Sequence, residues 1–228
     1  MRLIFVRHPQ TEANTKKLIY GRLDAVYSKQ GRATVPAIVR SLHDIEIDAI
    51  FASPLSRTRL LAEEIAADHG IAAARLRFDD RILEMNFGVL EGLTAEEARA
   101  QQGEVYQALL DHYEEYQIPE GESCLMVYAR AKEFLTELYE GFESGAAQGK
   151  VAPWGEAEAV RRREKTVVVV SHSMVIHMAL AWLLHQEPHE IWHIKLEPGA
   201  VADLDWRFDF AMLQGISGPL QVSAPANC

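Results

Sequence analysis

The stretch Met1–Asn14, MRLIFVRHPQTEAN, decides the fold of this chain. Arg2–Val6 is short, apolar and rich in residues that favour β-strands, which predicts a buried strand. The run stops at Arg7, His8 and Pro9, and a proline favours extended backbone in the residue before it. Open parallel sheets bind their ligands beyond the carboxyl ends of the strands. We therefore expect this strand to carry a cation and an imidazole to a ligand site.

A second apolar strand, TVVVVSHS at 166–173, ends in the same way. Four consecutive valines predict a central strand that is covered on both faces. If the two strands are neighbours, the imidazoles of His8 and His172 lie in one crevice. Ser173 then starts a helix, whose free N–H groups and positive dipole end face that crevice. A single histidine is better explained as a plain strand end, and it is the pair, with Arg7 beside one of them, that favours a shared site.

Strands that alternate with helices predict an α/β fold, a three-layer α/β/α arrangement around a mostly parallel central sheet. Ser28 is the expected cap of a helix that Pro36 kinks, and Ser53 is the expected cap of the next helix. Thr94 opens a capping box with Glu97. The expected strands lie at 2–6, 49–53, 75–78 and 166–171, with a terminal hairpin at 200–217, and the expected helices at 28–42, 53–70, 92–116, 125–141 and 173–185.

Length, composition and charge limit the class of protein. The 228 residues, 48% of them hydrophobic, fit a single domain over 1–228, with a Gly/Ala/Glu-rich flexible insertion at 141–166. The net charge of −10 argues against nucleic-acid partners. The two cysteines form no CxxC pattern, no leader pattern opens the chain, and the longest apolar run is too short to span a bilayer. We expect a cytoplasmic protein without membrane partners, either a monomer or a homodimer.

Arg57 lies on the first turn of the helix that follows the second strand. A cation at that position opposes the helix dipole, whose amino-terminal end prefers negative charge. A bound anion would resolve this conflict. The alternative is a surface arginine that pairs with Glu63 or Glu64.

Glu84 stands in the apolar segment ILEMNFGVLEGL. An apolar pocket favours the protonated form of a carboxyl group, which suits a proton donor near neutral pH. The alternative is an exposed carboxylate in a loop.

Together these residues resemble the histidine phosphatase superfamily, also called the phosphoglycerate mutase-like family. The family opens with Arg-His-Gly-Glu-Thr-x-x-Asn, and Pro9 and Gln10 depart from that pattern, as Ser173 departs from a later glycine. The matching elements are Arg7–Asn14, Ser53–Thr58, Leu83–Gly92, Gly121–Ser123 with Arg130, and Val170–Ser173. The resemblance runs in order from Met1 to about Leu204 and implies the phosphoglycerate mutase-like fold.

The resemblance also implies a mechanism. His8 is the expected nucleophile, Arg7 and Arg57 clamp the phosphoryl oxygens, His172 donates to the same phosphate, and Glu84 handles the proton of the leaving group. No metal or other cofactor is expected, because the arginines supply the positive charge. The further phosphate-binding and substrate-binding candidates are Thr11, Asn14, Ser173, Tyr20, Gly21 and Arg22.

The segment after Glu84 separates two activities. Family mutases tend to read Glu-Arg-x-Tyr-Gly, whereas this chain has Met85 and Phe87, which favours a phosphatase acting on a small phosphorylated metabolite. The loop Tyr20–Ser28 resembles that of the α-ribazole phosphatases. The alternatives are a phosphoglycerate mutase, a regulatory module that binds phosphate without catalysis, and a zinc protease, whose HExxH pattern HEIWH at 189–193 matches.

Overall fold

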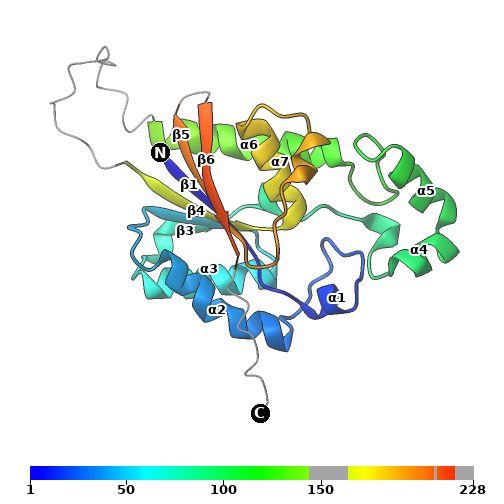
Figure 1. Cartoon of the computed structure of the whole chain (residues 1–228), viewed down its shortest axis with the longest axis horizontal. Helices are drawn as coiled ribbons and strands as arrows, with labels where there is room; N and C mark the ends of the chain where they lie inside the picture. The colour runs from blue at the N-terminus through cyan, green and yellow to red at the C-terminus, as the bar shows by residue number, and fades with distance from the viewer. Residues whose placement is uncertain (144–163, 208–209, 219–228) are drawn as a thin grey trace.

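The computed structural model describes residues 1–143, 164–207 and 210–218. Within them, six strands form one sheet in the order β3-β2-β4-β1-β5-β6 (Figure 1). The strands are β1 (Arg2–Arg7), β2 (Ala49–Ala52), β3 (Leu76–Phe78), β4 (Thr166–Ser171), β5 (Val201–Arg207) and β6 (Phe210–Ser217). The sheet is mostly parallel, as expected, because β3, β2, β4 and β1 run in one direction.

The register of the central strands brings the two motif ends together. β4 pairs in parallel with β1, and Arg7 lies opposite Ser171 at the carboxyl ends of both strands. His8 and His172 therefore leave neighbouring strands at the same level. On the other side of β1, the antiparallel hairpin of β5 and β6 closes the sheet, as the terminal pattern predicted.

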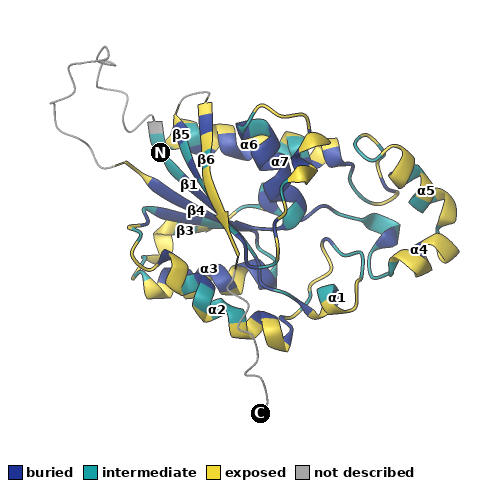
Figure 2. Cartoon of the chain, in the orientation of Figure 1, coloured by how far each residue is buried: buried dark blue, intermediate teal, exposed yellow. Residues whose placement is uncertain are grey.

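Alternate residues of β1 and β4 serve two hydrophobic cores. Leu3 and Phe5 pack with α6 (Cys124–Glu143) and α7 (Ser173–Leu183) on one face of the sheet. Ile4 and Val6 pack with α2 (Lys29–Leu42) and α3 (Ser56–Asp68) on the other. This period of two is the rule for a strand covered on both faces. Figure 2 shows the buried central strands β1 and β4 between helices whose outer surfaces are exposed, which confirms the three-layer α/β/α fold.

Three short helices, α1 (Glu12–Thr15), α4 (Ala95–Gln101) and α5 (Gly103–Asp111), lie beyond the carboxyl ends of the strands (Figure 1). The capping box of Thr94 and Glu97 is confirmed. The single helix expected over 92–116 is wrong, because the backbone at Gln102 (φ −132°, ψ 39°) leaves the helical region and divides it into α4 and α5.

One other helix expectation needs correction. Ser53 does not cap α3, which begins at Ser56 with Leu55 in the capping position and no side-chain cap bond. The Ser53 hydroxyl instead bonds to the ring of His172. Ser28 caps α2 as expected, accepting from the Gly31 N–H, and the helix continues through Pro36.

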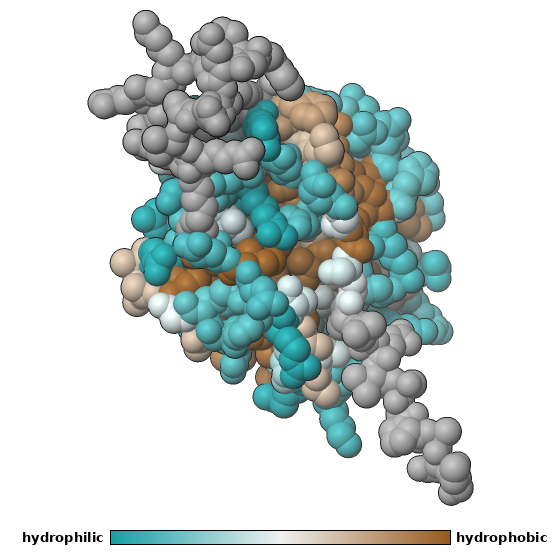
Figure 3. Space-filling model, turned by 60° about the vertical axis from the view of Figure 1, so that its left-hand side comes forward, coloured by the Kyte–Doolittle hydropathy of each residue, from teal (hydrophilic) through white to brown (hydrophobic). Residues whose placement is uncertain are grey.

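Of the insertion expected at 141–166, residues 144–163 lie outside the described residues, and α6 and β4 bound them. No helix in the described part of the chain is long and apolar enough to cross a bilayer. On the side where the parallel strands begin, the surface shows an apolar band between hydrophilic side chains (Figure 3).

The central position of β4 makes a stability prediction. Val168 is fully buried between β1 and β2, so Val168→Ala leaves a cavity and is expected to cost about 2 kcal/mol of unfolding free energy. Val26→Ala is the matched control, because Val26 is 66% exposed and its truncation should change stability by less than about 0.5 kcal/mol. Urea unfolding measures both, and equal costs would contradict the central placement of β4.

Candidate active site

A pocket of about 270 Å³ opens at the carboxyl ends of β1 and β4. It combines polar side chains expected from the sequence with an apolar wall that was not expected. Its lining residues are Arg7, His8, Asn14, Leu18, Ile19, Tyr20, Arg57, Glu84, Phe87, Ser173, Met174 and Trp192.

His8 lines this pocket, and His172 lies beside it without being part of the lining. Their ring centroids are 5.2 Å apart and both side chains are buried. The Nδ1 atom of His8 lies 2.7 Å from the carbonyl oxygen of Pro9, which can only accept a hydrogen bond. Nδ1 therefore carries the proton in the neutral ring, and Nε2 keeps the lone pair. The backbone beside Pro9 selects the tautomer that a nucleophilic Nε2 needs.

Burial and nearby cations set the charge of His8. Removal from water lowers the pKa of His8 well below its usual value of 6.5, and the positive charges of Arg57 and Arg7 lower it further. The hydrogen bond to Pro9 opposes this shift without cancelling it. The imidazole is consequently neutral at neutral pH.

His172 is held by partners on both ring nitrogens. Arg57 Nε donates to Nδ1 at 3.3 Å, so Nδ1 is the acceptor and Nε2–H donates to the Ser53 hydroxyl at 2.8 Å. Burial first, and then the charge of Arg57, lower the pKa of His172 well below 6.5. This ring is a neutral, oriented neighbour of His8.

Arg57 is 1% exposed and reaches the site from the first turn of α3. Its guanidinium donates to the carbonyl oxygens of Gly21 and Leu23, and the hydroxyl of Tyr27 donates to its backbone carbonyl. The guanidinium bonds to Gly21, Leu23 and His172 use three of its five N–H groups, which leaves two for an anion. The alternative of a surface pair with Glu63 or Glu64 is therefore wrong.

Arg7 is the second cation of the pocket. Its Nη1 donates to the carbonyl of Leu196, and its buried Nε has no partner among the described residues. Burial lowers the pKa of both Arg7 and Arg57, but an arginine remains protonated in proteins. A buried, unpaired guanidinium N–H is costly unless a ligand oxygen accepts from it, so the site suits an oxyanion.

Glu84 faces the two arginines from the pocket wall and is 7% exposed. Its Oε1 accepts from the backbone N–H of Met85 at 3.0 Å, and its Oε2 accepts from that of Met174 at 3.4 Å. Met174 lies in the first turn of α7, so the carboxyl group also meets the positive end of that helix. The alternative of an exposed loop carboxylate is wrong.

The segment that carries Glu84 is fastened to its surroundings by two further carboxylates. Glu122 accepts a bidentate pair from Arg130 at 3.0 and 3.1 Å and also accepts from the N–H of Asn86. Glu91 accepts from the N–H groups of Arg22 and Phe87. The two carboxylates thus bond to backbone donors of the Glu84 loop and of the neighbouring Arg22 loop, which fixes the position of the segment.

Gly21 allows the close contact between this loop and the Tyr20–Ser28 loop. A Cβ at Gly21 would lie 1.6 Å from the carbonyl oxygen of Met85. The sequence predicted Gly21 and Arg22 as substrate-binding residues, but neither lines the pocket. Gly21 accepts from Arg57, and Arg22 pairs with Glu122 at 3.4 Å. Both residues therefore contact other residues of the site without lining the pocket.

Thr11, Asn14 and Tyr20 form a small hydrogen-bonded cluster. Asn14 Oδ1 accepts from the N–H and hydroxyl of Thr11 and from the hydroxyl of Tyr20, at 2.9–3.0 Å. This arrangement engages the Asn14 oxygen and leaves its Nδ2 group as a donor for the pocket that Asn14 lines. Thr11 is fully buried outside the lining, so it positions Asn14 and Tyr20.

Sequence reasoning missed the apolar wall, which includes Phe87, Met174 and Trp192. Trp192 belongs to the segment HEIWH, which was considered only as a zinc motif. Residues Glu190–His193 form one short 3₁₀ turn, which does not present His189 and His193 as an α-helix would. In the described part of the chain, no three His, Cys, Asp or Glu side chains are grouped as metal ligands.

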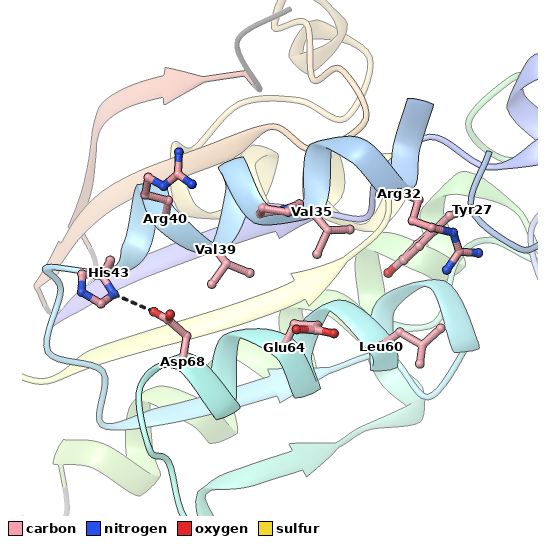
Figure 4. A pocket seen from close by; sticks show the side chains of 10 residues that line it. Tyr27, Arg32, Val35, Val39, Arg40, His43, Leu60, Glu64 and Asp68 are labelled. Atoms are coloured by element: carbon pink, nitrogen blue, oxygen red, sulfur yellow. Dashed lines mark hydrogen bonds and ion pairs between the residues drawn. The ribbon is translucent and has the colours of Figure 1, made fainter. Parts of the chain in front are cut away.

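A larger groove of about 760 Å³ lies between α2 and α3 and holds none of the predicted catalytic side chains (Figure 4). Val35, Val39 and Leu60 face it, and Arg40 and Asp68 lie near one end. Tyr27, at the other end, connects it to the site by its bond to the Arg57 carbonyl. Arg7, His8, Arg57 and Glu84 line the smaller pocket instead.

Comparison with known proteins agrees with this geometry. The family model for the histidine phosphatase superfamily (branch 1) matches residues 3–216. Phosphoserine phosphatase 1 of Hydrogenobacter thermophilus is 29% identical over 192 residues, which cover 84% of this chain and 80% of that protein.

Solved structures show the same fold. The alpha-ribazole phosphatase of Shigella flexneri superposes with a TM-score of 0.78 at 22% identity, covering 94% of this chain and 95% of that one. A mycobacterial glucosyl-3-phosphoglycerate phosphatase superposes with a TM-score of 0.76 at 24% identity, covering 95% and 99%. The chain is therefore a phosphatase that belongs to branch 1 of the histidine phosphatase superfamily.

Proposed function

We propose that this protein hydrolyses small phosphomonoesters in two steps, through a phosphohistidine formed on His8. The observation that carries the proposal is the neutral His8, whose Nε2 lone pair lies in a pocket with two buried guanidinium groups. A cationic histidine could not attack phosphorus, and an isolated neutral one would not hold the phosphoryl group in place. The site combines a nucleophile with the charge that positions its target.

In the first step, the Nε2 lone pair of His8 attacks phosphorus and the bond from phosphorus to the ester oxygen breaks. Arg7 and Arg57 bind the non-bridging oxygens, where negative charge remains high. Glu84, as the acid, gives its proton to the departing oxygen. The Nδ1–H bond to the Pro9 carbonyl stabilises the positive charge that the phosphorylated ring acquires.

In the second step, Glu84 is a carboxylate and takes a proton from water. The water oxygen bonds to phosphorus, the phosphorus–nitrogen bond breaks, and His8 returns to its neutral form. Inorganic phosphate leaves with the alcohol already released. Asn14 Nδ2 and the N–H groups at the start of α7, including that of Ser173, support the phosphoryl group in both steps.

The charges of Arg7 and Arg57 make a metal ion unnecessary in this scheme, and the mechanism uses only groups of this chain. Met85 stands where family mutases tend to carry an arginine and is buried, so the mutase alternative is less favoured. We also propose a cytoplasmic location, supported by the two-cysteine composition. The absence of nucleic-acid partners and the homodimer remain predictions.

His8→Ala tests the nucleophile. It should abolish hydrolysis of p-nitrophenyl phosphate, measured in EDTA, and the covalent phosphate found after acid-free quenching. The loss should exceed about 10³-fold, because the covalent route disappears. His43→Ala is the matched control, since His43 is exposed at the end of α2 and should retain full activity. A His8→Ala protein with the wild-type rate would show that another group attacks phosphorus.

The charge of His8 can be measured directly by ¹⁵N NMR of histidine-labelled protein in phosphate-free buffer. At pH 6.5, His8 should be mostly neutral, because burial and the arginines lower its pKa. His43 should be more than half protonated at the same pH, because the hydrogen bond and charge of Asp68 raise its pKa. His8→Asn and His43→Asn assign the signals. A His8 that titrates at or above pH 6.5 would contradict the electrostatic account.

Glu84→Gln tests the proton donor. Glutamine keeps the shape of the side chain but provides no acidic proton. We expect hydrolysis of alkyl phosphates to fall about 10²–10⁴-fold, whereas formation of the phosphoenzyme from p-nitrophenyl phosphate falls much less, because its leaving group needs little protonation. Rapid-quench measurement of the first step compares the two esters. Equal slowing of both would remove Glu84 from the acid role.

A further inference from the structure

The pocket has two chemically different halves. Arg7, Arg57 and Glu84 are the charged side chains among its described lining residues, and the mechanism assigns all three to the phosphoryl group or its leaving oxygen. The wall that remains for the leaving group is apolar. It consists of Leu18, Ile19, Phe87, Met174 and Trp192.

Trp192 is the largest member of this wall, and it is held from two sides. Its ring stacks on His177 with centroids 4.4 Å apart and an interplanar angle of 28°. Tyr113 meets it edge to face, with centroids 5.8 Å apart. His177 is itself buried, with its ring nitrogens 2.7 and 2.9 Å from the carbonyl oxygens of Ser173 and Ile194.

This support makes Trp192 a preorganised surface. The indole is 40% exposed while it lines the pocket, so a face or edge remains for a ligand. The hydroxyl of Tyr113 also contacts the sulfur of Met174, the next member of the wall, at 3.6 Å. An aromatic ring fixed before binding loses little entropy when a ligand packs on it.

The wall offers no compensation to a charged leaving group. Phosphoserine carries an ammonium and a carboxylate beside its phosphate, and every charged lining group in the described residues is already assigned to the phosphoryl chemistry. Taking such charges out of water without partners is costly. The volume of about 270 Å³ lies below the range of about 300–1,000 Å³ for drug-sized ligands, so the leaving group is small.

We propose that the preferred substrates are monoesters of small, uncharged alcohols with an apolar or aromatic body, and that Trp192 is the residue that selects them. This inference rests on the proposed function, because the position of the leaving group follows from the phosphoryl site. It assigns to the HEIWH segment a part in substrate selection.

A matched pair of alkyl esters tests the substrate class. We expect kcat/KM for 2-phenylethyl phosphate to exceed that for O-phosphoserine by at least about tenfold. Equal rates, or a preference for phosphoserine, would overturn the inference and leave the proposed function intact.

Binding of non-hydrolysable analogues keeps the two proposals separate. Calorimetry compares 3-phenylpropylphosphonate, the analogue of 2-phenylethyl phosphate, with 2-amino-4-phosphonobutyrate, the analogue of O-phosphoserine. In each analogue a CH₂ group replaces the ester oxygen. Tighter binding of the phenyl compound supports the apolar site even if no ester is turned over, a result that would refute only the proposed function. Tighter binding of the amino acid analogue would overturn the inference.

Variants of Trp192 test whether this residue selects the leaving group. Trp192→Ala should raise KM for 2-phenylethyl phosphate about fivefold or more with little change in kcat, and should leave KM for ethyl phosphate within about twofold, because only the larger ester reaches the ring. Trp192→Phe should recover most of the loss. Trp182→Phe is the matched control, because Trp182 packs edge to face on Trp206 outside this pocket and should behave as wild type. An unchanged ratio of the two KM values in Trp192→Ala would overturn the assignment.

Discussion

Two buried guanidinium groups beside two neutral imidazoles are the constraint on which this structure depends. Cations are expensive to remove from water. The negative charge of Glu84 offsets part of that cost, and Arg57 is also held by the backbone carbonyls of Gly21 and Leu23 and by the ring of His172. Burial first, and then this positive charge, lower the pKa of both His8 and His172, which keeps the two rings neutral. In the proposed mechanism, the phosphoryl group of the substrate offsets the cost of burying both guanidinium groups.

The carboxylates Glu91 and Glu122 lie outside the pocket lining and hold the loops that form the site. They accept from backbone N–H groups of the Arg22 loop and the Glu84 loop, and Glu122 is held in turn by Arg130. The resemblance of Gly121–Ser123 and Arg130 to a family element thus has a physical reason. These residues fix the segment that carries Glu84, and the close approach at Gly21 locks the second loop against it.

The phosphoryl half of the pocket and its apolar half come from different parts of the chain. The first is built from strand ends and helix starts, which the two hydrophobic cores hold rigidly. The second uses loop residues such as Phe87 and Trp192, where one fold accommodates different leaving groups by changing side chains. Relatives with one mechanism and different named substrates are the expected result of such a division.

The sequence by itself determined the α/β class, the central valine strand, the position of the first motif at a strand end, and the presence of Arg7, His8, Arg57, Glu84 and His172 at one site. The class, the strand and the position of the first motif follow from short-range periodicity and from motifs at strand ends, and the grouping of the five side chains follows from the resemblance to the family. The sequence placed the start of α3 at Ser53, because a capping pattern does not reveal that the Ser53 hydroxyl bonds to His172. It predicted one helix in place of α4 and α5, because helix propensity does not reveal the backbone break at Gln102. Only the tertiary structure decided that Arg22 and Thr11 lie outside the pocket lining, and that Trp192 is part of it. Those positions depend on contacts between residues about 15 to 115 places apart in the chain, such as Trp192 with His177 and Arg57 with His172, and no local pattern encodes them.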